Sequence, residues 1–256
     1  MDDTVRTFYD QFASSYHLIF ADWQAAVARQ ATTLDWLIQH ELGPGPHTVL
    51  DCACGIGTQA IGLARLGHRV HATDLSPVAV ARAADEAAIA GVAITLGVSD
   101  MRDLSGQVPG TFDVVLACDN ALPHLLTDDD LRLAAVNIAS TLRPGGLFLA
   151  SIRDYDDMVQ DQPVSEAPRV FEDDAGRRIT FQVWDWAPDG DTYQVHQFLL
   201  RHTGNEWHTD HFETTYRALL RADLDAALHA AGLEHIRWLA PDESGYYQPV
   251  VTARAR

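Results

Sequence analysis

The chain has 256 residues, 47% of them hydrophobic, which is enough for one α/β domain with a substantial core. Its net charge of −18 disfavours a nucleic-acid partner, because binding to phosphates relies on basic side chains. All 18 basic residues are arginine, which excludes lysine Schiff-base chemistry and a P-loop lysine. No apolar run reaches the roughly 20 residues that cross a bilayer, and the first residues carry no secretory signal. We therefore expect a cytoplasmic protein without a membrane partner.

Residues 5–40 carry apolar side chains at helical spacing, and the Gly-Pro pairs at 43–46 end this pattern. Short apolar runs then alternate with helical segments. The sequence predicts strands at 47–51, 70–73, 94–98, 112–118 and 147–152. It predicts helices at 59–66, 77–90 and 128–142, the second of them capped by Ser76. This alternation is typical of a Rossmann-like, doubly wound and mostly parallel sheet.

The alternation stops after residue 153. A β meander is predicted with strands at 169–172, 178–186, 192–202 and 207–216, joined by turns at 174–176, 188–190 and 203–205. A helix at 222–231 and strands at 234–239 and 247–254 bring the main sheet to seven strands. We expect a single α/β domain, 1–256. Its parts are an N-terminal helical lid at 1–42, a cofactor-binding core at 43–156, an antiparallel insertion at 157–216 and a C-terminal helix with strands at 217–256.

The turn after the first strand has the composition of a ligand-binding turn. Gly55 and Gly57 let the backbone bend sharply and approach a ligand closely. Asp51 precedes them at the end of the strand, where a carboxylate would repel a pyrophosphate and suits a cationic amino group. Burial of Asp51 without such a partner would be costly.

Acidic residues also end the next two predicted strands. Asp74 ends the second strand, where an acid can accept both ribose hydroxyls of an adenosine. Asp100 and Met101 follow the third strand and are predicted to hold the adenine amino group and to cover its ring. Four neighbouring residues complete the predicted cofactor site, namely Cys52, Ala53, Leu75 and Cys118.

A dinucleotide-binding turn is the other interpretation of this region that stays open. The segment Gly55–Ala60 also fits the G-x-G-x-x-A pattern of dinucleotide enzymes, although that match alone is weak. The three cysteines do not suggest a disulfide framework, and we expect them to be core or loop-wall residues.

The sequence resembles class I S-adenosylmethionine-dependent methyltransferases through VLDCACGIGT, ATD, SDMRDL and LRPGG, across roughly residues 47–152. This resemblance implies S-adenosylmethionine as the cofactor and a small molecule as the methyl acceptor. A narrower resemblance, to glycine and glycine/sarcosine N-methyltransferases, is carried by residues 137–147 and by Ile152–Asp156. That family also contains oligomers, so homo-oligomer formation stays open.

The narrower resemblance implies roles for residues on the acceptor side. Arg153 matches the arginine that holds the substrate carboxylate, and a guanidinium can grip a carboxylate with two hydrogen bonds. The alternative is an ion pair between Arg153 and the neighbouring Asp154 or Asp156. Asn120 matches a residue that orients the acceptor nitrogen, and His124 either helps it or has a structural role.

Three further residues follow from the same resemblance. Arg29 matches an arginine that holds the methionine carboxylate of the cofactor, and Tyr16 is the candidate for a tyrosine lining the methyl-transfer tunnel. Tyr216 matches a pocket tyrosine. Periodicity alone would make Tyr16 a core aromatic residue. Asp119 departs from the family, which has glycine there, and could hold a cationic or larger amine.

Several functions remain to be separated. The leading expectation is N-methylation of a small amine that bears a carboxylate, such as glycine or sarcosine. The alternatives are O- or N-methylation of another small metabolite, a non-catalytic adenosylmethionine-binding regulator, and a dehydrogenase. No metal site is expected, because the spacings of His196, His202, His208 and His211 on antiparallel strands do not suggest a compact ligand set.

Overall fold

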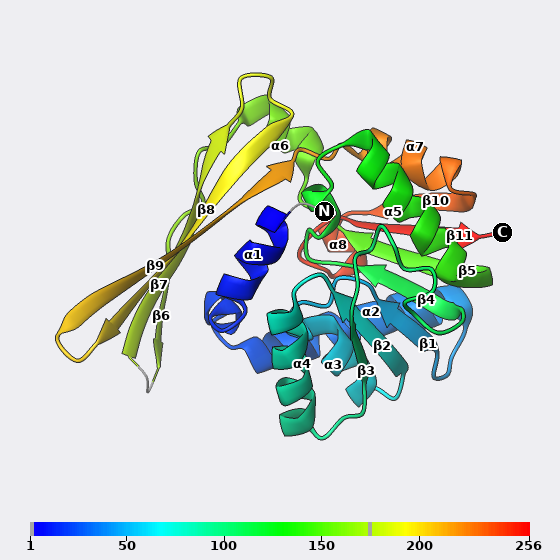
Figure 1. Cartoon of the computed structure of the whole chain (residues 1–256), viewed down its shortest axis with the longest axis horizontal. Helices are drawn as coiled ribbons and strands as arrows, with labels where there is room; N and C mark the ends of the chain where they lie inside the picture. Colours follow the sequence, from blue (N-terminus) through cyan, green and yellow to red (C-terminus); the bar gives the residue numbers. More distant parts are fainter. Residues whose placement is uncertain (1–2, 174–175) are drawn as a thin grey trace.

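The computed structural model describes residues 3–173 and 176–256, and a seven-stranded sheet forms its core (Figure 1). The spatial order of the strands is β10-β11-β5-β4-β1-β2-β3. In chain order they are β1 (Thr48–Asp51), β2 (Arg69–Asp74), β3 (Thr95–Val98), β4 (Phe112–Ala117), β5 (Leu142–Ser151), β10 (Leu233–Leu239) and β11 (Val250–Ala255). All pairs from β5 to β3 are parallel, and β11 runs antiparallel to both of its neighbours. The predicted mostly parallel α/β sheet is confirmed.

Helices cover both faces of this sheet because its central strands are apolar on both sides. Val114 and Leu116 of β4 pack with α2 (Trp23–Leu42) and α3 (Thr58–Arg65), whereas Val115 and Ala117 face α5 (Asp128–Thr141) and α7 (Arg221–Ala230). Helix α4 (Pro77–Ala90) begins as predicted, since the Ser76 hydroxyl accepts a hydrogen bond from the backbone N–H of Ala79.

The N-terminal segment with helical spacing over 5–40 is helical but broken into separate elements. Helix α1 spans Asp3–Phe12, a 3₁₀ turn η1 spans Tyr16–Ile19, and α2 starts only at Trp23. Asp22 has an extended backbone and accepts a hydrogen bond from the Ala25 N–H at 2.9 Å, which caps the start of α2. Helical periodicity continues through the break and hides it.

Four other elements differ from the prediction. Strand β5 begins at Leu142, so the Arg-Pro-Gly-Gly segment lies within the strand. Short helices, α6 (Tyr155–Asp161) and α8 (Pro241–Ser244), and a 3₁₀ turn, η2 (Leu122–His124), occupy segments predicted as loops or strand ends. None of the described helices combines the length and apolarity of a membrane span.

The predicted meander forms a second, four-stranded antiparallel sheet, inserted after β5. Its strands are β6 (Arg169–Asp173), β7 (Gly176–Trp186), β8 (Thr192–Thr203) and β9 (Glu206–Arg217). Two residues of the predicted first turn, 174 and 175, lie outside the described residues. Figure 1 shows α1 between this sheet and the body of the molecule, and Phe12 of α1 contacts Phe212 of β9 with ring centroids 4.7 Å apart.

Candidate active site

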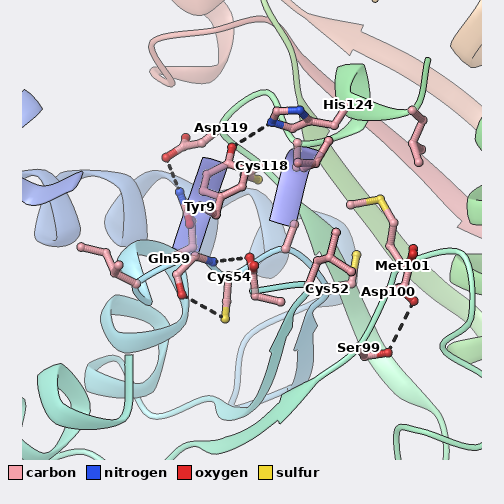
Figure 2. Close-up of a pocket in the computed structure, with 18 of the residues that line it drawn as sticks. Tyr9, Cys52, Cys54, Gln59, Ser99, Asp100, Met101, Cys118, Asp119 and His124 are labelled. Carbon is pink, nitrogen blue, oxygen red and sulfur yellow. Dashed lines mark hydrogen bonds between the residues drawn. The ribbon is translucent and has the colours of Figure 1, made fainter. Parts of the chain in front are cut away.

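A cavity of about 860 Å³, counted with its open mouth, lies at the carboxyl ends of β1 to β4 (Figure 2). This is the edge where α/β sheets bind ligands. Most of the predicted cofactor residues line it, namely Cys52, Ala53, Gly55, Asp74, Leu75, Asp100, Met101 and Cys118. Tyr16 and His124, which were predicted on the acceptor side, also line it.

Asp51 lies directly before the lining residue Cys52 and is only 1% exposed. One carboxylate oxygen, Oδ1, accepts a long hydrogen bond of 3.4 Å from the Ala53 N–H. The other, Oδ2, is buried and has no hydrogen-bond partner among the described residues. Burial is the main reason that the pKa of Asp51 rises to about 7. An unsatisfied buried carboxylate of this kind fits a cationic amino group.

Asp74 connects the two turns that flank the cavity. Its carboxylate accepts hydrogen bonds from the backbone N–H of Gly55 at 2.8 Å and of Ser76 at 2.9 Å. Burial nevertheless raises the pKa of Asp74. The Ser76 hydroxyl also donates to Asp10 of α1 at 2.5 Å, so the N-terminal helix is tied to the same turn.

The glycine turn has the backbone conformation that its sequence predicts. Gly55 and Gly57 have φ angles of 51° and 93°, in the left-handed region. A Cβ at Gly57 would also lie 2.9 Å from a carbon of Ile61, so the turn and helix α3 pack closely here. Gly57 therefore shapes the turn from behind and does not line the cavity.

The third acid of the site is held by an arginine. Arg102 forms an ion pair with Asp100 at 2.7 Å and another with Asp130 of α5 at 2.6 Å. These contacts fix the loop after β3, which places Ser99, Asp100 and Met101 along one wall of the cavity (Figure 2).

A second, larger cavity of about 1450 Å³ adjoins the first and shares Tyr9, Tyr16 and Asp119 with it. The meander sheet, α1, α2 and the segment before β11 enclose it. Five of the predicted site residues line this cavity, namely Tyr16, Arg29, Asn120, Arg153 and Tyr216. Arg29, predicted to hold the cofactor, is thus on the wall of the second cavity and not of the first.

Arg153 is held by the meander sheet. Its guanidinium donates to the Gln182 side-chain oxygen at 2.6 Å and to the Tyr193 hydroxyl at 2.9 Å, and lies 3.7 Å from a Glu166 oxygen. It also lies over the Trp184 ring, 5.0 Å from the centroid. Its side chain is 17% exposed.

The alternative pairing of Arg153 with its acidic neighbours is absent among the described contacts. Asp154 and Asp156 face Arg221 instead, at 2.7 and 3.6 Å. Arg221 therefore pairs with these two acids, and Arg153 lies on the wall of the second cavity.

The turn after β4 gives two neighbouring side chains different partners. Asp119 and Asn120 both have left-handed backbones, with φ angles of 58° and 66°, which short polar side chains tolerate. Asn120 donates to the Tyr155 hydroxyl at 2.9 Å and accepts from the Arg153 backbone N–H at 3.0 Å. The turn therefore fixes the start of the segment that carries Arg153.

Asp119 is saturated by three donors at the junction of the two cavities. Its carboxylate accepts from Gln59 at 2.7 Å, from the Tyr246 hydroxyl at 2.5 Å and from the Tyr247 hydroxyl at 2.9 Å. Burial raises the pKa of Asp119, and these hydrogen bonds oppose the rise. The residue that departs from the family pattern thus has a network of its own.

Aromatic rings also line the junction of the two cavities. The Tyr9 hydroxyl is 2.9 Å from Nε2 of His124, and the His124 ring lies 4.3 Å from the Tyr216 ring. Burial is the main reason that the pKa values of Tyr9, Tyr16 and Tyr216 are raised, so these hydroxyls stay neutral at physiological pH.

Sequence patterns did not identify several of the residues that shape the site. Tyr9, Gln59, Gln182, Tyr193, Tyr246 and Tyr247 come from segments far apart in the chain. The only signal available for them was helical periodicity for Tyr9 and strand alternation for Gln182 and Tyr193, and neither pattern distinguishes a site from a core.

Comparisons with known proteins agree with this geometry. Residues 49–146 match a family described as a methyltransferase domain. The chain is 26% identical to the glycine/sarcosine N-methyltransferase of Halorhodospira halochloris over 84% of each protein. It is also 26% identical to the enzyme of that name from Parasynechococcus marenigrum, over 71% of this chain and 66% of that one.

Solved structures show the same fold. DesVI of Streptomyces venezuelae superposes with a TM-score of 0.80 at 19% identity, covering 95% of this chain and 98% of that one. The amino pentose methyltransferase CalS10 of Micromonospora echinaspora, solved with S-adenosylmethionine bound, gives a TM-score of 0.72 at 18% identity, covering 90% and 92%.

Taken together, the fold, the acids at the strand ends and these matches support a class I S-adenosylmethionine-dependent methyltransferase. CalS10, which shares the fold, was solved with S-adenosylmethionine bound. Among the relatives described above, the two matched by sequence are glycine/sarcosine N-methyltransferases.

Proposed function

We propose that the enzyme transfers the methyl group of S-adenosylmethionine to the nitrogen of a small amine that carries a carboxylate, with glycine and sarcosine as the leading acceptors. The observation that carries this proposal is the charge of the second cavity. Although the protein has a net charge of −18, the lining of the second cavity includes three arginines, Arg29, Arg153 and Arg169. Only two acids, Asp119 and Glu166, line it with them. Such a local excess of arginine suits an anionic acceptor.

The first cavity fits the cofactor. Asp51 would pair with the amino group of the methionine portion, Asp74 with the ribose hydroxyls, and Asp100 with the adenine amino group, beside Met101. When bound, the cofactor supplies a methyl group already activated by its positively charged sulfur. The residues of this chain therefore need not supply a nucleophile, and their task is to hold the acceptor in line and to exclude water.

The junction of the cavities supplies that positioning. Tyr9 and Tyr16 line both cavities, His124 lines the first and Tyr216 the second. These four side chains would exclude water between donor and acceptor, and Asn120 and Arg153 would face the acceptor. An acceptor amine must present a neutral lone pair, and enclosure among buried aromatic rings lowers the pKa of an ammonium. Arg153 would then orient the carboxylate so that the amine faces Asn120.

The test is a comparison of Arg153→Ala and Arg153→Lys with an exposed control, Arg177→Ala. Loss of a charged hydrogen-bonding partner costs about 1.5–3 kcal/mol, which predicts a kcat/KM for glycine or sarcosine reduced about 10- to 150-fold in Arg153→Ala. The lysine variant should recover only part of this loss, because it lacks the two-pronged geometry. Affinity for S-adenosylhomocysteine should stay unchanged. An unaltered KM for every amino-acid acceptor would refute the proposal.

A second candidate acceptor is an amino sugar. The cavity of about 1450 Å³, counted with its open mouth, has room for an acceptor larger than glycine, and the amides of Gln182, Gln197 and Gln248 on its wall are of a kind that binds hydroxyl groups. CalS10, which shares the fold, is an amino pentose methyltransferase. A panel of amino acids and amino pentoses, with detection of S-adenosylhomocysteine, separates the two. Turnover of the sugars alone, insensitive to Arg153→Ala, would favour this second candidate.

A further inference from the structure

Three side chains with metal-ligand chemistry converge on the meander sheet, on the face turned away from the active site. Along β8, Tyr193, Val195 and Gln197 are buried towards the body of the molecule, so His196 between them points to the opposite face. His196 is the direct cross-strand partner of Glu213 on β9, and His211 lies two residues before Glu213 on the same face. The group therefore comes from two neighbouring strands.

The sequence spacings of these histidines gave no expectation of a compact set, yet His196 and His211 lie close together. The strand register explains the difference. Phe198 pairs with His211, so His211 lies diagonal to His196, within reach of its ring. The His211 ring also stacks on Phe198 at 4.8 Å, which holds it beside its neighbour.

The ligand atoms lie near the spacing that a metal site needs. His196 Nδ1 lies 2.9 Å from His211 Nε2 and 3.6 Å from Glu213 Oε2, and one ligand atom from each residue falls within 4.8 Å of the others. Bonds of about 2.0–2.2 Å to a tetrahedral Zn²⁺ put neighbouring ligand atoms roughly 3.3–3.5 Å apart. Small side-chain rotations bring the three atoms to that spacing.

A fourth residue prepares His196 for this role. The Asp185 carboxylate on β7 lies 3.1 Å from Nε2 of His196. When Nε2–H donates to this carboxylate, Nδ1 carries the lone pair that faces His211. This is the carboxylate–histidine arrangement that orients metal ligands. Two ring nitrogens 2.9 Å apart must otherwise share one proton, which a divalent cation replaces.

We propose that His196, His211 and Glu213 bind one divalent transition-metal ion, with Zn²⁺ as the best match, and that Asp185 orients His196 from behind. Two imidazoles and a carboxylate are a ligand set that suits zinc and leaves a fourth position for water. The ion would cross-link β8 and β9 on the face opposite Tyr193. Because Tyr193 holds Arg153, the ion would stiffen the sheet that supports the acceptor cavity without touching a substrate.

The test uses the full-length protein, stripped with a chelator and titrated with Zn²⁺ in competition with a metal indicator dye. The expected result is one tight site per chain. His211→Ala and Glu213→Gln should weaken binding at least tenfold, and Asp185→Asn should weaken it 10- to 100-fold. His208→Ala is the matched control, because His208 is an exposed histidine on β9 outside the cluster, and it should bind like the unmodified protein. Co²⁺ in the site should give the visible absorption of a tetrahedral complex.

A second readout does not depend on the dye. Zn²⁺ should raise the thermal unfolding midpoint of the unmodified protein and of His208→Ala, and leave that of His211→Ala unchanged. Binding that is equal in all of these variants, or that falls as much in His208→Ala as in His211→Ala, would overturn the proposal. Absence of Zn²⁺ binding at micromolar concentrations would do the same.

Discussion

The unpaired carboxylate of Asp51 predicts how cofactor binding depends on pH. With a pKa of about 7, about one tenth of the free protein has an ionised Asp51 at pH 6 and about nine tenths at pH 8. The ionised form is the one that attracts a cationic amino group, and that amine in turn lowers the pKa of the carboxyl when bound. We therefore expect affinity to rise about tenfold from pH 6 to pH 8 and then to level off.

The assay is titration calorimetry with S-adenosylhomocysteine, which carries the same amino group as the cofactor. At pH 6 binding should release close to one proton from Asp51, which is measured by repeating the titration in buffers of different ionisation enthalpy. Asp51→Asn should bind more weakly throughout the range and lose the tenfold pH effect.

Asp74 provides the main competing signal, because burial also raises its pKa. The relevant quantity is therefore the difference between the unmodified protein and Asp51→Asn, in which Asp74 is unaltered. If both proteins show the same pH dependence, or if affinity of the unmodified protein falls from pH 6 to pH 8, the pairing of Asp51 with the amine is refuted.

Two further predictions concern stability. Because the folded-state pKa of Asp51 lies above its ordinary value of 3.8, the free protein loses stability as the pH rises from about 4 to about 7, by up to about 4 kcal/mol. Asp51→Asn should remove this loss, so urea denaturation should show a higher unfolding free energy than the unmodified protein at pH 8 but not at pH 4. An equal effect of the substitution at both pH values would contradict this prediction. Gly62→Ala should destabilise the protein by about 1–3 kcal/mol, because the new Cβ would lie 2.5 Å from the Ala31 Cβ and 2.8 Å from the Val27 carbonyl oxygen. This clash should outweigh the helix propensity of alanine, which favours the substitution by about 1 kcal/mol. A stabilised Gly62→Ala variant in the same denaturation assay would show that α2 and α3 separate easily.

The alternating core was predictable from the sequence because each of its signals is local. Apolar runs such as Phe112–Ala117 indicate buried parallel strands, and Ser76 followed by Pro77 marks the start of a helix. The acids Asp51 and Asp74 end such runs, so topology alone brings them to one edge of the sheet. The breaks around η1 were missed because the apolar spacing stays helical across them. The capping of α2 by Asp22, which starts a new helix there, leaves no mark in that spacing.

The acceptor side was predictable only in part, because its contacts are between distant segments. Position relative to β5 indicated Arg153, but its partners Gln182 and Tyr193 depend on how the meander sheet folds back over the body. The donors to Asp119 come from α3 and from the segment before β11, and no local pattern joins them. The roles assigned to the site residues, and the division of the chain into four parts, stay predictions that the experiments above address.

The placement of the meander has a consequence for how this enzyme can change. The acids of the proposed donor site lie at the carboxyl ends of strands in the seven-stranded sheet or just after them, whereas Gln182, Val195 and Gln197 on the wall of the second cavity belong to the inserted sheet. Substitutions on those strands can therefore retune which molecule is methylated while the donor pocket keeps its shape. We therefore expect acceptor specificity to change through the inserted sheet while the cofactor site in the main sheet stays the same. Engineering of new acceptors should begin in the insertion.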